Sequence, residues 1–160
     1  MTAPRNFGLA AIGMTAALIA MVGAGNLAAA APSPASVIAA RQANYKKMGA
    51  AMKVLKDQLG SGTIDKVKAV AAAKTLASTG RQQAGLFPNG SGPSSGAKTA
   101  ALPAIWTKRT VFDAEMRNLV AQSDKLVAAS ATGNAAAIGA QFKAVGASCA
   151  SCHKQFRAQD

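Results

Sequence analysis

Apolar side chains recur at intervals of three and four residues in three segments of the chain, and a fourth segment has a less regular apolar stripe. This spacing is that of one face of an α-helix, and no stretch sustains the two-residue alternation of a strand. Such intervals are also typical of helices that pack nearly parallel or antiparallel. The four stripes are Ile38, Arg41, Tyr45, Met48, Met52, Leu55 and Leu59; Val67, Val70 and Leu76; Phe112, Met116, Leu119, Ser123 and Leu126; and Ile138, Phe142, Val145, Cys149, Cys152 and Phe156. The pattern predicts an all-α fold, an antiparallel up-down four-helix bundle.

Helix-starting and helix-breaking residues separate the four segments. Ser33 and Pro34 suit the N-cap and first position of the first helix, and Thr63 can cap the second helix with Asp65 in its first turn. Pro103 marks the start of the third helix. We expect breaks between helices at 60–62, in the Gly- and Pro-rich loop 87–96, and at 133–134. The second helix should reach about residue 84.

The first 31 residues have the composition of a cleavable export signal. Arg5 precedes an uncharged stretch, 6–31, that is rich in Ala, Leu, Ile and Met and ends in small residues suited to a signal peptidase. The alternative is a retained membrane anchor, but the strongly apolar part, 8–22, is shorter than the ~20 residues that a span needs. We therefore expect a signal peptide at 1–31, cleaved near Ala30 or Ala31. The mature protein, 32–160, is then one domain and not an integral membrane protein.

The composition narrows the class of protein further. Half of the residues are hydrophobic, many of them alanine, and only 4% are aromatic, so a bundle built from them has a thin core. The net charge is +12, and the predicted signal contributes only the charge of Arg5 to it. Because the basic residues are scattered and no aromatic platform accompanies them, we expect no nucleic-acid binding. A solvated basic surface that can steer an acidic partner or favour acidic lipids is the simpler interpretation.

Both cysteines and the only histidine lie together in Cys149-Ala150-Ser151-Cys152-His153, a CxxCH motif. On a helix these three side chains share one face, so Cys149 and Cys152 can each form a thioether to one porphyrin while His153 ligates its iron. CxxCH is the attachment signature of haem c. A redox dithiol usually opens the helix of a βαβ unit, and a structural zinc site needs about four ligands, so both alternatives are weaker.

The motif therefore predicts one covalently bound haem c with His153 as its iron ligand. The predicted export signal agrees with this interpretation, because apocytochromes c cross the bacterial inner membrane before haem is attached. Together the two features predict a periplasmic protein.

Two polar residues, Arg41 and Tyr45, interrupt the apolar stripe of the first segment. A buried guanidinium without an anion is strongly unfavourable, and a haem propionate is the simplest anion to propose because Arg can meet it bidentately. The alternative is that Arg41 extends to solvent. Tyr45, one turn further along, would approach the haem face opposite His153, or else pack in the core with its hydroxyl on a carbonyl.

The C-terminal CxxCH of an exported bundle, together with Arg-Gln-x-x-Tyr in the first helix, resembles cytochrome c′, the class II c-type cytochromes. The matching stretches cover about 35–158. They are 41–49, the Leu-Phe-Pro-Asn-Gly loop at 86–90, Ile105-Trp106, 145–149 and 153–157.

The resemblance implies a pentacoordinate haem with His153 as the proximal ligand and Tyr45 at the distal position. It implies that Arg41 and Gln42 meet the propionate edge and that Arg157 is a basic residue on the proximal side. Family members bind NO and CO, commonly pair as homodimers through their first two helices, and are binding or electron-transfer proteins rather than enzymes. The chain departs from many relatives in its high basic charge and in Gln82-Gln83-Ala84-Gly85, where no second aromatic residue precedes the loop.

A dedicated electron carrier is the alternative function. Met48 or Met52 would then close the iron as a sixth ligand and raise its potential. The residue at the distal level decides between the two functions, and the resemblance puts Tyr45 there.

Overall fold

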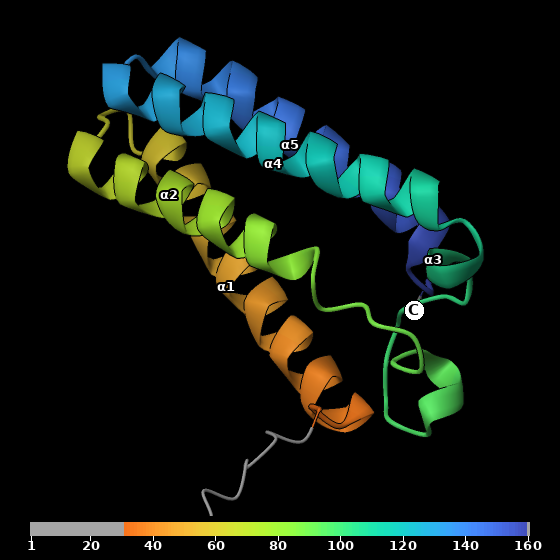
Figure 1. Ribbon diagram of the computed structural model, residues 1–160. Helices are drawn as coiled ribbons and strands as arrows, with labels where there is room; N and C mark the ends of the chain where they lie inside the picture. The colour runs from red at the N-terminus through yellow and green to blue at the C-terminus, as the bar shows by residue number, and fades with distance from the viewer. Residues whose placement is uncertain (1–30, 160) are drawn as a thin grey trace, which may run out of the picture. The chain divides into compact units, whose positions relative to one another are not determined.

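The computed structural model describes residues 31–159. Within them the regular secondary structure is helical, and loops, turns and one isolated bridge between Ala101 and Arg157 make up the rest. The long helices run in alternating directions along the chain (Figure 1). The elements are α1 (Pro34–Gly60), α2 (Lys66–Gln83), a 3₁₀ turn (Pro93–Ser95), α3 (Ala104–Thr107), α4 (Arg109–Thr132) and α5 (Ala135–Phe156). The predicted antiparallel up-down four-helix bundle is confirmed, and no described helix is long and apolar enough to cross a bilayer. Residues 1–30, which hold nearly all of the predicted signal peptide, lie outside the described residues.

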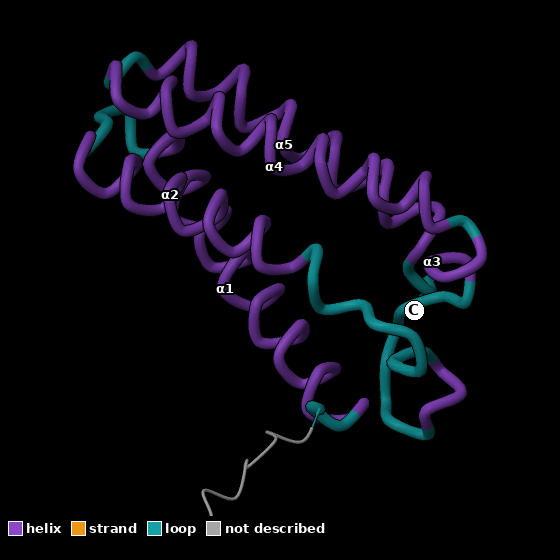
Figure 2. Tube along the Cα trace, viewed as in Figure 1, coloured by secondary structure: helices purple, strands orange, loops and turns teal. Residues whose placement is uncertain are grey.

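The bundle is more open between α1 and α5 than between its other neighbouring helices. α2 packs against both α1 and α4, and α4 packs against α5, whereas α1 and α5 touch much less extensively. Short turns connect α1 to α2 and α4 to α5 at one end of the bundle, and the long connection from α2 to α3 lies at the other end (Figure 2). That second end therefore brings together the beginning of α1, the end of α5 and the long loop.

The helix boundaries follow the capping residues of the sequence. The Ser33 hydroxyl accepts a hydrogen bond from the Ser36 amide at 3.2 Å, and the Asn134 side chain accepts one from the Ala137 amide at 3.0 Å. Gly133 ends α4 with φ at 73°, a left-handed conformation that glycine adopts without strain. The prediction for Thr63 was wrong, because Asp65 is the N-cap of α2 and its carboxylate accepts from the Lys68 amide.

Two further details differ from the expected pattern. The third helix is not continuous from Pro103, because the backbone of Lys108 has φ −118° and ψ 43° and separates α3 from α4. Val67 is 80% exposed rather than part of the α2 stripe. It lies nine residues before the buried Leu76, which is about half a turn away on the helix circumference. Alanines provide half of the buried residues of α2 instead, namely Ala69, Ala72, Ala73 and Ala77.

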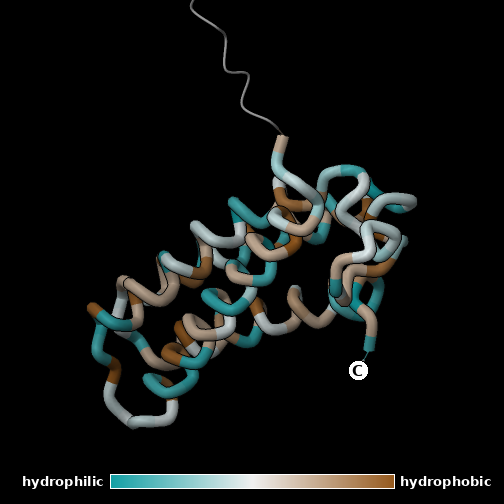
Figure 3. Tube along the Cα trace, turned by 90° about the horizontal axis from the view of Figure 1, so that it is seen from below, coloured by the Kyte–Doolittle hydropathy of each residue, from teal (hydrophilic) through white to brown (hydrophobic). Residues whose placement is uncertain are grey.

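The other stripes form the core as predicted. Figure 3 shows the apolar positions recurring between hydrophilic ones along each helix. All five positions of the α4 stripe are buried, and Ile138, Val145 and Phe156 are buried on α5. The remaining α5 positions, Phe142, Cys149 and Cys152, are only half-buried, and the two cysteines face the cavity described below.

The α2–α3 loop, residues 84–103, is fixed at both of its ends. The Trp106 indole nitrogen donates to the Pro88 carbonyl at 3.0 Å, and Arg109 donates to the Phe87 carbonyl at 2.9 Å. At the other end the Ala158 amide donates to the Ala100 carbonyl at 2.8 Å. These bonds hold the loop beside the end of α5.

Mutation of Asn134 tests whether this residue caps α5. Replacing Asn134 with Ala removes the acceptor for the Ala137 amide, and we expect the free energy of unfolding to fall by about 1 kcal/mol. Asn134→Ser keeps a capping oxygen and should remain close to the wild type in chemical denaturation. Equal destabilisation by both variants would contradict a capping role.

Candidate functional site

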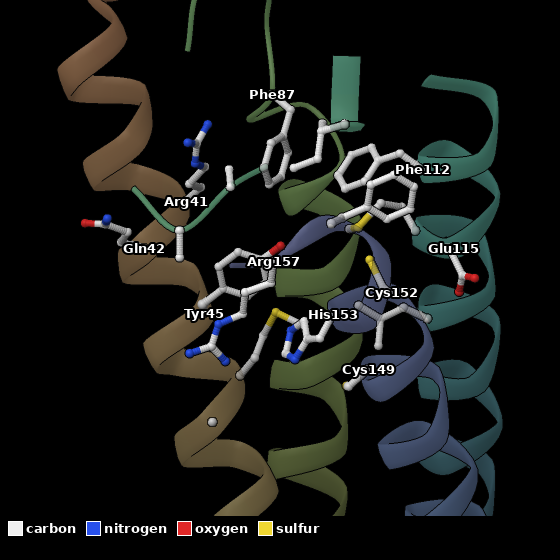
Figure 4. A pocket seen from close by; sticks show the side chains of 18 of the residues that line it. Arg41, Gln42, Tyr45, Phe87, Phe112, Glu115, Cys149, Cys152, His153 and Arg157 are labelled. Carbon is white, nitrogen blue, oxygen red and sulfur yellow. The ribbon is translucent and has the colours of Figure 1, made fainter. Parts of the chain in front are cut away.

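A cavity of about 480 Å³ lies between α1, the C-terminal part of α5 and the α2–α3 loop. Its volume falls within the ~300–1,000 Å³ range of small-molecule and cofactor sites. Every site residue expected from the sequence lines it (Figure 4): Arg41, Gln42, Tyr45, Cys149, Cys152, His153 and Arg157, together with the alternative ligands Met48 and Met52. Much of the remaining wall is apolar, formed by Leu76, Phe87, Ile105, Phe112, Met116, Leu119 and Phe156.

The last turns of α5 carry the CxxCH motif along one side of this cavity. Cys149 and Cys152 are free thiols and half-buried, as is His153. Figure 4 shows their side chains on the face of α5 toward which Tyr45 extends from α1. The helix thus presents two thiols and an imidazole to one space, as the spacing predicted.

The environment of the two thiols keeps them protonated at neutral pH. Burial raises the pKa of Cys149. The pKa of Cys152 is raised to about 11 by burial, by the nearby carboxylate of Glu115 and by Cys149. Reactive dithiols of oxidoreductases have lowered pKa values, so these directions oppose the redox-dithiol interpretation.

The imidazole of His153 is biased toward its neutral form. Burial lowers its pKa, and the positive charge of Arg157 lowers it further. A neutral imidazole has a free nitrogen lone pair, which is the form that ligates a metal. Arg157 follows at the C-cap of α5, where its amide donates to the His153 carbonyl at 3.1 Å.

Arg41 is buried rather than directed to solvent, which rules out the alternative considered from the sequence. It is 2% exposed, and its guanidinium donates to the Ser91 hydroxyl at 3.1 Å and to the Thr99 hydroxyl at 2.7 Å. The guanidinium carbon lies 4.7 Å from the centre of the Phe87 ring, within cation–π distance. No carboxylate of residues 31–159 forms an ion pair with it. Burial lowers the pKa of Arg41, and Tyr45 opposes this effect.

Gln42 lies beside Arg41 at the edge of the cavity. Its amide nitrogen donates to the Lys98 carbonyl at 3.0 Å, so α1 contacts the loop through two successive side chains.

Tyr45 is the least buried of the cavity residues on the α1 stripe. It is 37% exposed, in contrast to the buried position that the stripe predicted, because this part of α1 faces the cavity. Burial of the hydroxyl nevertheless raises its pKa, and the Gln83 side chain partly opposes the shift. The phenol is therefore neutral at physiological pH.

The structure adds residues that sequence reasoning missed. Glu115 lines the cavity and accepts hydrogen bonds from Ser151 at 2.8 Å and from Gln155 at 3.4 Å, so it connects α4 to the CxxCH segment. The sequence did carry a signal for Glu115, because it lies three residues after Phe112 and therefore on the same face of the helix. Ser91 and Thr99 had none, because the loop has no periodicity and their partner Arg41 is 50 and 58 residues away.

An all-helical bundle whose last helix presents CxxCH to an apolar cavity defines a class, the c-type cytochromes built as four-helix bundles. A family model described as Cytochrome C' matches residues 36–157. The chain is 33% identical over 146 residues to the cytochrome c' of Allochromatium vinosum, which covers 90% of this chain and 94% of that protein.

Solved structures give the same assignment. The crystal structure of cytochrome c' from Thermochromatium tepidum matches with a TM-score of 0.76 and 32% identity, covering 81% of this chain and 100% of that one. A cytochrome c' described as having an unusual ligand-controlled dimer dissociation matches with a TM-score of 0.74 and 31% identity, over 81% and 100% of the two chains. The chain belongs to the cytochrome c' family.

The family implies a c-type haem, and the residues of the cavity fit one. Two thiols and a neutral imidazole share one wall, apolar side chains form most of the rest, and Arg41 supplies a buried cation that no described carboxylate neutralises. A flat, mainly apolar group with anionic propionates matches this set of partners.

Removing the buried cation tests its role in the haem-loaded protein. If Arg41 pairs with a haem propionate, Arg41→Leu leaves that anion unpaired, and we expect the free energy of unfolding to fall by about 1–3 kcal/mol. The midpoint potential should fall as well, because a nearby cation favours the reduced, less positive haem. Arg81→Leu is the matched control, since Arg81 forms an exposed ion pair with Asp124 on α4. Wild-type stability and potential in Arg41→Leu would contradict the assigned role.

Proposed function

We propose that this chain is an exported haem protein that binds small neutral gases, NO and CO, at a pentacoordinate iron and also exchanges electrons. The observation that carries the proposal is the meeting of Cys149, Cys152, His153 and the buried Arg41 at one apolar cavity. When bound, haem supplies an iron that takes up diatomic gases and changes oxidation state by one electron.

The residues of α5 hold the group. Cys149 and Cys152 anchor one haem by two thioethers, and His153 offers a ring nitrogen to the iron from the same helix face. Their attachment to a regular helix fixes these three side chains relative to one another. Glu115 supports the segment through its hydrogen bonds with Ser151 and Gln155.

The cationic residues orient the propionate edge. Arg41 meets a propionate, Gln42 lies beside it, and Arg157 keeps positive charge near His153. The burial of Arg41 supports this role, because an anion gains most from a cation that water does not screen.

The distal face determines which ligands enter. Tyr45 lines the cavity with a neutral phenol, which is a poor iron ligand but can exclude bulky groups and donate a hydrogen bond. A largely apolar pocket of this kind favours neutral diatomic gases over anions. We therefore assign gas binding as the main function, without catalysis.

The cellular setting belongs to the same proposal. Residues 1–31 act as a signal peptide, 32–160 form the mature domain, and the protein works in the periplasm. The mature protein pairs as a homodimer, and its basic surface accepts an acidic redox partner. Sedimentation of the purified haem protein showing only monomers across a wide concentration range would refute the dimer.

A dedicated electron carrier remains the second candidate function. Met48 and Met52 both line the cavity on α1, the helix that carries Tyr45. Either sulfur as a sixth ligand would give a low-spin iron and leave no site for a gas.

Intact mass tests attachment and export together. After expression with a cytochrome c maturation system, the purified protein should have the mass of a chain beginning near residue 31 or 32 plus one haem. Cys149→Ala and Cys152→Ala should each lower or abolish the covalent yield, because each removes one thioether. Ser148→Ala, which changes the neighbouring residue but no thiol, should retain it. A wild-type mass equal to that of the bare polypeptide would refute haem attachment.

The distal role of Tyr45 is tested by ligand kinetics. Tyr45→Ala should speed CO binding to the ferrous protein several-fold, because it opens the cavity. Tyr45→Phe keeps the bulk and removes only the hydroxyl, so its association rate should stay close to the wild type. Flash photolysis measures both rates, and an unchanged rate in Tyr45→Ala would show that Tyr45 does not control access.

A further inference from the structure

The α2–α3 loop supplies the only hydroxyls that hydrogen-bond the Arg41 guanidinium within residues 31–159. Ser91 is fully buried, and its oxygen lies 3.1 Å from one terminal guanidinium nitrogen. Thr99 lies on the cavity wall, and its oxygen is 2.7 Å from the other terminal nitrogen. The two hydroxyls lie eight residues apart in the loop.

Both hydroxyls are themselves oriented as acceptors for Arg41. The Ser91 hydroxyl donates its proton to the Pro88 carbonyl at 2.8 Å, so its lone pairs are left for the guanidinium. The Thr99 oxygen also accepts a hydrogen bond from the Ala101 amide at 3.1 Å. These contacts fix where each oxygen lies before any ligand enters the cavity.

Neutral partners hold the guanidinium in place without cancelling its charge. A carboxylate at either position would neutralise Arg41 and compete with a propionate for it. A guanidinium carries five N–H donors, and the two hydroxyl bonds leave others for an anion on the cavity side. The Phe87 ring, whose centre lies 4.7 Å from the guanidinium carbon, adds a further contact without a compensating negative charge.

We propose that Ser91 and Thr99 are positioning residues for the haem. They hold the Arg41 guanidinium at the cavity wall, with its charge unneutralised, so that it faces a propionate and raises the midpoint potential. This inference rests on the proposed haem function.

A purely structural role makes a different prediction. If Ser91 and Thr99 only fold the loop, their loss lowers stability while the propionate alone keeps Arg41 in place, and the potential does not change. If they position Arg41, their loss lets the guanidinium move away from the haem edge, and the potential falls.

The test measures haem content first and then the midpoint potential of the haem-loaded full protein. Ser91→Ala and Thr99→Val should each lower the potential in the same direction as Arg41→Leu but by a smaller amount. Thr99→Ser restores a hydroxyl and should recover the wild-type value. Ser94→Ala is the matched control, because Ser94 is exposed on the same loop, and it should leave the potential unchanged.

A double variant decides whether the effect acts through Arg41. In the Arg41→Leu background, Thr99→Val should cause no further change of potential. A normal potential in haem-loaded Thr99→Val and Ser91→Ala, or an equal shift with and without Arg41, would overturn the positioning role while leaving the haem function intact. A wild-type protein that incorporates no haem would overturn both.

Discussion

The arrangement of the site depends on the contacts that hold the charged guanidinium of Arg41 inside the protein, all of them with neutral partners. A guanidinium removed from water is costly unless hydrogen bonds and an anion compensate for it. The guanidinium donates hydrogen bonds to the hydroxyls of Ser91 and Thr99 and lies against the ring of Phe87, but none of the described carboxylates forms an ion pair with it. In our proposal a haem propionate compensates for the charge that remains, and Arg41 then links the fold to the cofactor.

The bundle brings this charge to the CxxCH motif through its topology. Up-down connections place the start of α1, the end of α5 and the α2–α3 loop at the same end. Phe87, Phe112 and Phe156 then link the loop, α4 and α5 through edge-to-face contacts with ring centres 4.8 and 5.3 Å apart. With alanine forming much of the α2 face, these rings and the cavity residues provide the bulk of the apolar surface around the site.

The sequence predicted the helices well because large apolar residues mark the buried faces of α1, α4 and α5. It failed for Val67 because alanines carry the buried face of α2, and a single valine on the opposite side gave a misleading stripe. These cavity residues could be found because CxxCH has a fixed chemistry and Arg41 stands out on an apolar stripe. The exposure of Tyr45 and the partners of Arg41 could not be predicted, since they depend on how a loop without periodicity folds back onto α1.

The central claim is a haem held by α5 with an iron open to gases on the Tyr45 side. An optical spectrum of the purified ferric and ferrous protein tests it most directly, because the spectrum reports haem type, spin state and coordination together. We expect a c-type haem with a high-spin, five-coordinate ferrous iron that binds CO and NO. A low-spin ferrous spectrum that becomes high-spin in Met48→Leu or Met52→Leu would contradict it, and would identify a methionine-closed electron carrier.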